Sequence, residues 1–168
     1  MSDVRDAAGV SLRRLYSLYP AKRDLVAAWL DDRHHRWMEW FASTVARYVS
    51  EDVPPLLATF DALREWVRSP GYRGCAFLNA IAETSEIDDA HRAIVAHHKR
   101  ALIDRLTTLA TSPPGATGAG DEQWVPQAIA VLIDGAIVQS AVLGSEAPVE
   151  AARAAAARML GFSTGASA

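Results

Sequence analysis

The sequence lacks most of the features that mark disulfide-rich, membrane and sheet proteins. A single cysteine among 168 residues excludes an internal disulfide and is typical of a reducing cytoplasm. No secretory signal is visible at the start, and no apolar run approaches the roughly 20 residues of a membrane span. Few stretches alternate in the way that strands require, so we expect no β-sheet. These absences favour a soluble, cytoplasmic, all-α protein.

Motifs of common enzyme and metal sites are also missing. The chain has no glycine-rich phosphate loop, no nucleophile elbow and no helical zinc pair. The pairs His34-His35 and His97-His98 cannot each chelate one ion, because adjacent side chains on a helix point about 100° apart. We therefore expect no enzyme activity, no metal and no cofactor.

Helical periodicity is what the chain does contain. Half of its residues are hydrophobic, and apolar positions recur at helical spacing between prolines and glycines. The predicted helices are residues 4–8, 12–19, 21 to just before Pro54, 56–67, 73–83, 88–111, 124–143 and 149–160. We expect a mobile loop at residues 112–120 and a frayed tail from Gly161.

At the amino end, the residues that start and stop helices predict a helix, a tight turn and a second, basic helix. Gly9 lies where the chain must turn with a positive φ, and Ser11 is placed to cap the next helix. Residues 1–36 hold seven Lys or Arg against five Asp, a net charge of +2, which leaves −5 for the rest of a chain of net charge −3. A basic, capped helix after a turn is typical of a DNA-reading unit.

This segment resembles the tetracycline-repressor (TetR) family of bacterial regulators. The resemblance lies in Val4-Arg5-Asp6-Ala7-Ala8-Gly9-Val10-Ser11 and Leu15-Tyr16-Ser17-Leu18-Tyr19-Pro20-Ala21-Lys22-Arg23-Asp24-Leu25, and the later helical layout agrees with it. It implies a partial helix-turn-helix domain at 1–25, an effector-binding and dimerisation domain at 26–161 and a tail at 162–168.

By position, the resemblance implies that Ser11 starts a recognition helix. Leu12, Arg13, Arg14 and Ser17 would face the major groove, and Tyr16 and Lys22 would hold phosphates. Independently of the family, two adjacent arginines and a nearby lysine supply donors for base edges and for the DNA backbone. The alternative is that these are ordinary solvated charges.

Family members normally have a further helix before the point at which this chain begins. Without it, Val4, Val10, Leu15 and Leu18 would lose part of their apolar cover. If each leaves ~50 Å² wet, at ~25 cal/mol per Å² the four give up about 5 kcal/mol. We expect residues 1–20 to be loosely held and DNA affinity to be weak or absent, through a start assigned too late or a natural truncation.

Aromatic residues are candidates for an effector pocket. We predict that Trp40, Phe60, Trp66, Phe77 and Trp124 line it, with plain core packing as the alternative for each. His98 lies on the apolar stripe of its helix and would be a polar anchor. Cys75 follows a cation at a helix start and would be either a redox-active thiol or a buried small hydrophobe.

The last two predicted helices indicate a subunit interface. The helix at 124–143 is apolar nearly all round and must be buried on more than one side, and the following helix is rich in small residues. We therefore expect a homodimer through residues 122–161.

The resemblance implies a ligand-responsive transcriptional regulator, a repressor that a small-molecule effector releases from its operator. A second hypothesis is a dimeric sensing module that has lost DNA binding, and a third is a helical small-molecule enzyme. An in-frame basic helix encoded upstream would favour the regulator, and a stop codon there would favour the module.

Overall fold

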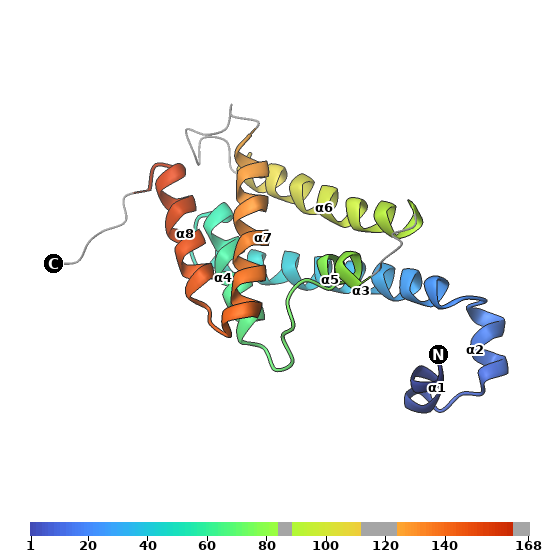
Figure 1. The fold of residues 1–168 in the computed structure, drawn as a ribbon. Coiled ribbons are helices and arrows are strands. Elements are labelled where there is room, and N and C mark those ends of the chain that lie inside the picture. The colour runs from blue at the N-terminus through green and yellow to red at the C-terminus, as the bar shows by residue number, and fades with distance from the viewer. Residues whose placement is uncertain (84–88, 112–123, 163–168) are drawn as a thin grey trace.

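The computed structural model describes residues 1–83, 89–111 and 124–162, and this part of the chain forms helices and no strand (Figure 1). The helices are α1 (Ser2–Ala8), α2 (Leu12–Leu18), α3 (Lys22–Ser50), α4 (Pro55–Arg68), α5 (Ala76–Glu83), α6 (Asp89–Ala110), α7 (Val125–Leu143) and α8 (Ala147–Met159). The all-α prediction is confirmed, with helix ends shifted by a few residues. The loop predicted at 112–120 and the tail after Phe162 lie outside the described residues.

The turn between α1 and α2 forms as its residues predict. Gly9 ends α1 with φ 64°, in the left-handed region that favours glycine. The Ser11 hydroxyl accepts a hydrogen bond from the Arg14 N–H at 3.2 Å, so Ser11 caps α2. Both expectations, the positive φ and the serine cap, are confirmed.

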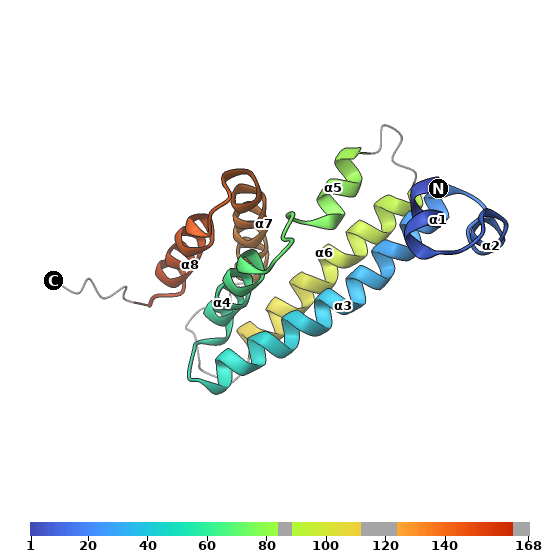
Figure 2. The same ribbon diagram turned by 90° about the horizontal axis from the view of Figure 1, so that it is seen from below.

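The body of the molecule is organised along α3. The Asp24 carboxylate accepts the Ala21 N–H at 2.8 Å and so satisfies one free donor where α3 begins. Helix α6 lies alongside α3, while α1 and α2 project from the amino end of α3, away from α7 and α8 (Figures 1 and 2). One long helix thus connects the amino-terminal pair to the body.

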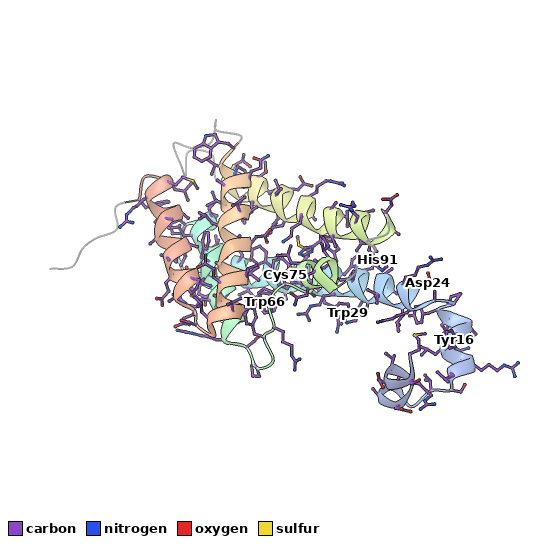
Figure 3. The ribbon with its side chains drawn as sticks, in the orientation of Figure 1. Tyr16, Asp24, Trp29, Trp66, Cys75 and His91 are labelled. Carbon is purple, nitrogen blue, oxygen red and sulfur yellow. The ribbon has the colours of Figure 1, made fainter. Side chains whose placement is uncertain are left out.

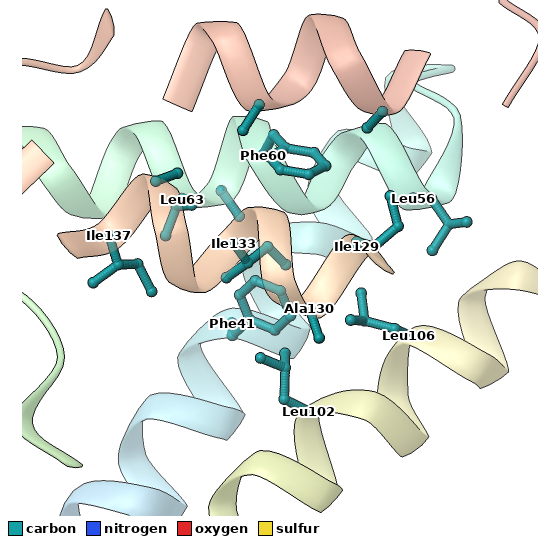
Figure 4. Packing of buried hydrophobic residues seen from close by; sticks show 14 of the residues in the cluster. Phe41, Leu56, Phe60, Leu63, Leu102, Leu106, Ile129, Ala130, Ile133 and Ile137 are labelled. Carbon is teal, nitrogen blue, oxygen red and sulfur yellow. The ribbon is translucent and has the colours of Figure 1, made fainter. Parts of the chain in front are cut away.

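The core lies where α3, α4, α6 and α7 meet (Figure 4). Phe41, Phe60 and Ile133 are fully buried there, and Leu102 nearly so. Helix α8 closes the other side of α4 through small residues, and a buried carboxylate joins the two helices. Asp61 lies 2.9 Å from Arg64 on its own helix and 3.0 Å from Arg153 on α8.

Helix α7 corrects one prediction. It is 19 residues long with a mean hydropathy of 1.6, so by length and composition alone it could cross a membrane, contrary to the expectation that no apolar run comes near that length. This is weak evidence for a span, since 44% of those residues are buried inside the protein, as in a core helix.

Candidate functional site

The predicted DNA-contacting side chains lie mostly in solvent on α2 and at the start of α3. Arg13, Arg14, Tyr16 and Lys22 are exposed, and Leu12 is half-buried. Figure 3 shows Tyr16 on α2, at the end of the molecule that carries the amino terminus. Neither arginine nor Lys22 forms an ion pair with any described residue. Ser17 is exposed as well, but its hydroxyl donates to the Arg14 carbonyl at 2.7 Å and is already engaged. The arginines are therefore free to meet an anionic partner.

Apolar side chains of the helix pair are largely uncovered, with one exception. Val4, Val10 and Leu18 are exposed, Leu18 to 54%, and α1 buries no residue. Leu15 is only 5% exposed, so the expectation that it loses part of its cover is wrong; α1 and α2 also contact each other. Little besides this contact holds α1 in place.

A cavity of about 270 Å³ opens between α3 and α4, and we call it the tryptophan cavity. Two predicted pocket residues, Trp40 and Trp66, line it. Trp37 lines it too, although it is not among the predicted pocket residues. Its place could have been found from the sequence, because Arg33, Trp37 and Trp40 are spaced i, i+4, i+7 on one helix face. The tryptophan cavity is lined by Arg33, Arg36, Trp37, Trp40, Glu65, Trp66 and Ser69.

A smaller space adjoins the tryptophan cavity on its inner side, and we call it the histidine recess. Arg33, Trp37 and Trp66 line both spaces, and Phe77 and His98 line the recess. The rings of Phe77 and His98 stack with centroids 3.7 Å apart and an interplanar angle of 11°. Four predicted pocket residues thus meet along one continuous wall.

The other two predicted pocket residues lie elsewhere. Phe60 is fully buried in the core between α4 and its neighbours and lines neither space. Trp124 precedes α7 and is 52% exposed, again away from both. Helical spacing places a residue on a face but not against a particular neighbour, so the sequence could not separate these two from the others.

His98 makes a contact that the sequence did not predict. Its Nδ1 lies 3.0 Å from Nδ1 of His34 on α3. Burial, and next the charge of Lys99, lower the pKa of His98 to about 3. Burial, and next His97 and His35, lower the pKa of His34. With both rings neutral, one Nδ1–H donates to the lone pair of the other. The expected polar anchor is thus itself held by a second histidine.

Cys75 lies beside the histidine recess, immediately before α5. It is buried, which favours the small-hydrophobe alternative over an accessible thiol. Gly74 precedes it with φ 78°, and a Cβ there would lie 3.1 Å from that of Ala141 on α7. The late start of α5 follows from this turn. No group of three ligating side chains forms a metal site in the described parts of the chain.

The outer face of α7 is apolar and uncovered. Val131 and Val142 are 71% and 79% exposed, and Val138 lies between them on the same face. Beside it runs a groove of about 270 Å³ whose lining contains no charged residue: Val131, Leu132, Gly135, Ala136, Gln139, Pro148, Ala151, Ala152 and Ala155. An exposed apolar face of this kind is typical of a protein interface.

Comparison with known proteins establishes the fold. No family model matches the sequence, and no curated protein matches it at a significant level. The structure is similar to that of a TetR-family transcriptional regulator from Streptomyces coelicolor, with a TM-score of 0.74 and 26% identity over 95% of this chain and 83% of that one. It is also similar to the reduced form of Escherichia coli NemR, with a TM-score of 0.79 and 18% identity over 95% of this chain and 85% of that one. The chain has the TetR-like fold, as its amino-terminal motif predicted.

Proposed function

We propose that this chain, with its TetR-like fold, is a cytoplasmic, homodimeric, DNA-binding transcriptional regulator and not an enzyme. One observation carries the proposal: the exposed Arg13 and Arg14, which form no ion pair with a described residue, lie on a capped helix joined directly to α3, and the middle of α3 lines the tryptophan cavity. A DNA-reading element and an effector pocket therefore share one helix. The likeness to a TetR-family transcriptional regulator supports the same assignment.

The dimer forms through the apolar outer face of α7 together with α8. This face exposes the apolar side chains of Val131, Val138 and Val142 to water. Full burial of each in the interface would contribute roughly 1.5–3 kcal/mol to the free energy of dimerisation. A two-fold axis places the same face of both copies in contact. It also presents two α2 helices to one DNA duplex, on half-sites about 34–36 Å apart.

The effector binds in the tryptophan cavity and releases the protein from its operator, so the protein acts as a repressor. Such a ligand must prefer the conformation that does not bind DNA, since equal affinity for both would shift nothing. Contacts of α3 with the ligand supply that preference, because any movement of α3 also moves α2.

Selection of binding sites from a random duplex library tests DNA binding without a known operator. We expect the wild-type dimer, in about 50 mM salt, to enrich an inverted repeat. The affinity will be weak, because α1 buries nothing and Val4, Val10 and Leu18 are exposed. Arg14→Ala should abolish enrichment, while Arg100→Ala, an exposed arginine on α6, should not. Enrichment that survives Arg14→Ala would contradict the assignment of α2.

A second function, a dimeric ligand-sensing module without DNA binding, is favoured by the poorly covered α1. It predicts a stable dimer that binds a ligand in the tryptophan cavity and enriches no DNA at any salt concentration. The selection experiment therefore separates the two functions, provided that dimerisation is verified by light scattering on the same sample.

A further inference from the structure

One charged side chain of the tryptophan cavity has no ion-pair partner among the described residues. Every other charged side chain that lines this cavity or the histidine recess is paired at 2.5 Å: Arg36 with Asp32, Glu65 with Arg47, and Lys99 with Asp134. Arg33 is half-buried, lines both spaces and forms no ion pair within the described residues. A partly desolvated guanidinium without a counter-ion is a ready site for an anion, and its planar fork matches a carboxylate.

A buried donor in the same wall is also unsatisfied. Trp37 is 8% exposed, and its indole Nε1–H has no hydrogen-bond partner in the part of the chain that the structure describes. Orphaned buried donors are rare in native proteins because each costs the desolvation of the group. The other nearby polar group is engaged, since the Ser69 hydroxyl donates to the Trp66 carbonyl at 2.6 Å. The tryptophan cavity therefore offers a cation, and the wall beside it holds a buried N–H that lacks an acceptor among the described residues.

The remaining walls favour a flat ring. Trp37 lies edge-on to Trp66 with centroids 5.7 Å apart, and Trp40 lies 6.5 Å from each of them. At these separations the three rings contact one another, so a planar guest would lie against the ring surfaces that face the cavity and not between the rings. Aromatic cages also bind quaternary ammonium groups, but the unpaired Arg33 would repel a cation.

Arg33 also lines a third space. This basic cleft, of about 430 Å³, lies between the first half of α3 and the segment before α5, and Trp29 contributes to it. Among the described residues its charged side chains are Lys22, Arg33 and Arg73, all of them basic. Clefts lined by charges of one sign raise the local concentration of the opposite ion. The anionic end of a ligand is thus favoured near Arg33.

Building on the proposed effector role of this site, we propose that the ligand of the tryptophan cavity is a planar aromatic carboxylate of one or two fused rings. Its ring lies against Trp37, Trp40 and Trp66, and its carboxylate accepts hydrogen bonds from the Arg33 guanidinium and from the Trp37 Nε1–H. A neutral aromatic would leave both donors unsatisfied. The buried histidines supply no competing charge, because burial holds the pKa of His98 at about 3.

Three probes of one shape test the proposal: 2-naphthoate, 2-naphthylmethanol and 2-naphthylmethylammonium. Each is titrated into the full chain by calorimetry, with quenching of tryptophan fluorescence as a second readout. We expect 2-naphthoate to bind about tenfold to a hundredfold more tightly than the alcohol, the range of a charge-assisted hydrogen bond. The ammonium should bind more weakly than either.

Two variants locate the effect. Arg33→Met should abolish the preference for the carboxylate while leaving the alcohol's affinity within about twofold. Trp37→Phe keeps a ring but removes the N–H, and should weaken 2-naphthoate about fivefold. Arg100→Met removes an exposed arginine of α6 outside these spaces and serves as the matched control. Circular dichroism verifies that each variant is folded.

The proposal is overturned if 2-naphthoate does not bind below millimolar concentration, if the alcohol or the ammonium binds as tightly, or if Arg33→Met keeps the preference. Failure of the proposed function looks different. In that case 2-naphthoate binds with the expected selectivity, but the protein is monomeric or enriches no DNA. Conversely, if the protein is a DNA-binding dimer but does not bind 2-naphthoate, the proposed ligand class is wrong and the proposed function stands.

Discussion

The stability of this protein should fall in mild acid because of the imidazole buried between α3 and α6. Burial, and next Lys99, lower the pKa of His98 from 6.5 to about 3 in the folded chain. In the unfolded chain the imidazole returns to about 6.5. Between these values the unfolded state binds a proton that the folded state does not. Stability is therefore present above the unfolded pKa and is lost as the pH falls toward 3.

The magnitude follows from the two pKa values. For each pH unit below the unfolded pKa of about 6.5, and above the folded pKa, the free energy of unfolding falls by about 1.4 kcal/mol. Lowering the pH from 7 to 5 therefore removes about 2 kcal/mol of stability through His98 alone. His34 adds a loss of the same sign, because burial and its histidine neighbours lower its pKa more than Asp31 raises it. A loss of this size is a large fraction of the 5–15 kcal/mol typical of a folded domain.

Urea unfolding followed by circular dichroism at pH 7 and pH 5 measures this loss. Protein concentration must be held constant, because dimerisation would link to unfolding. His98→Gln retains a polar group beside His34 but cannot titrate, and should remove about 2 kcal/mol of the pH dependence. Ile133→Val, a core change that costs about 1 kcal/mol at both pH values, is the matched control. If His98→Gln lost as much stability between pH 7 and 5 as the wild type, the reasoning would be refuted.

Two further predictions concern the interface and the turn before α5. Val138→Glu places a charge in the middle of the apolar face of α7 and should convert the dimer to a monomer by light scattering; a persistent dimer would exclude this face as the interface. Gly74→Ala combines a positive φ of 78° with a contact of 3.1 Å to Ala141, and should lower the free energy of unfolding by about 1–3 kcal/mol. Gly71→Ala, at φ 80° with no atom nearby, isolates the backbone strain and should cost less in the same urea assay.

Local signals explain what the sequence could predict. Gly9 and Ser11 define the turn before α2 through chemistry confined to a few residues, and the structure reproduces both. Prolines, glycines and the helical period likewise placed every described helix to within a few residues. Such features need no knowledge of the rest of the fold.

Contacts between different helices could not be predicted from these local signals. The bond between His34 and His98 joins residues 64 positions apart, and treating each histidine pair on its own helix could not reveal it. The burial of Leu15 was missed for the same reason. Phe60 and Trp40 have similar aromatic character, yet one lies in the core and the other in a cavity, since packing between helices decides which face meets solvent.

The length of α3 has a mechanical consequence. Its 29 residues form one uninterrupted rod about 44 Å long, and Lys22 lies 15 residues, or about 22 Å, from Trp37. If α3 pivoted at Trp37 by about 10°, Lys22 and the attached α2 would swing by about 4 Å. In a two-fold dimer the two displacements add. A ligand that shifts α3 by a small angle would therefore change the distance between the two α2 helices, which would no longer match the spacing of successive major grooves on a DNA duplex.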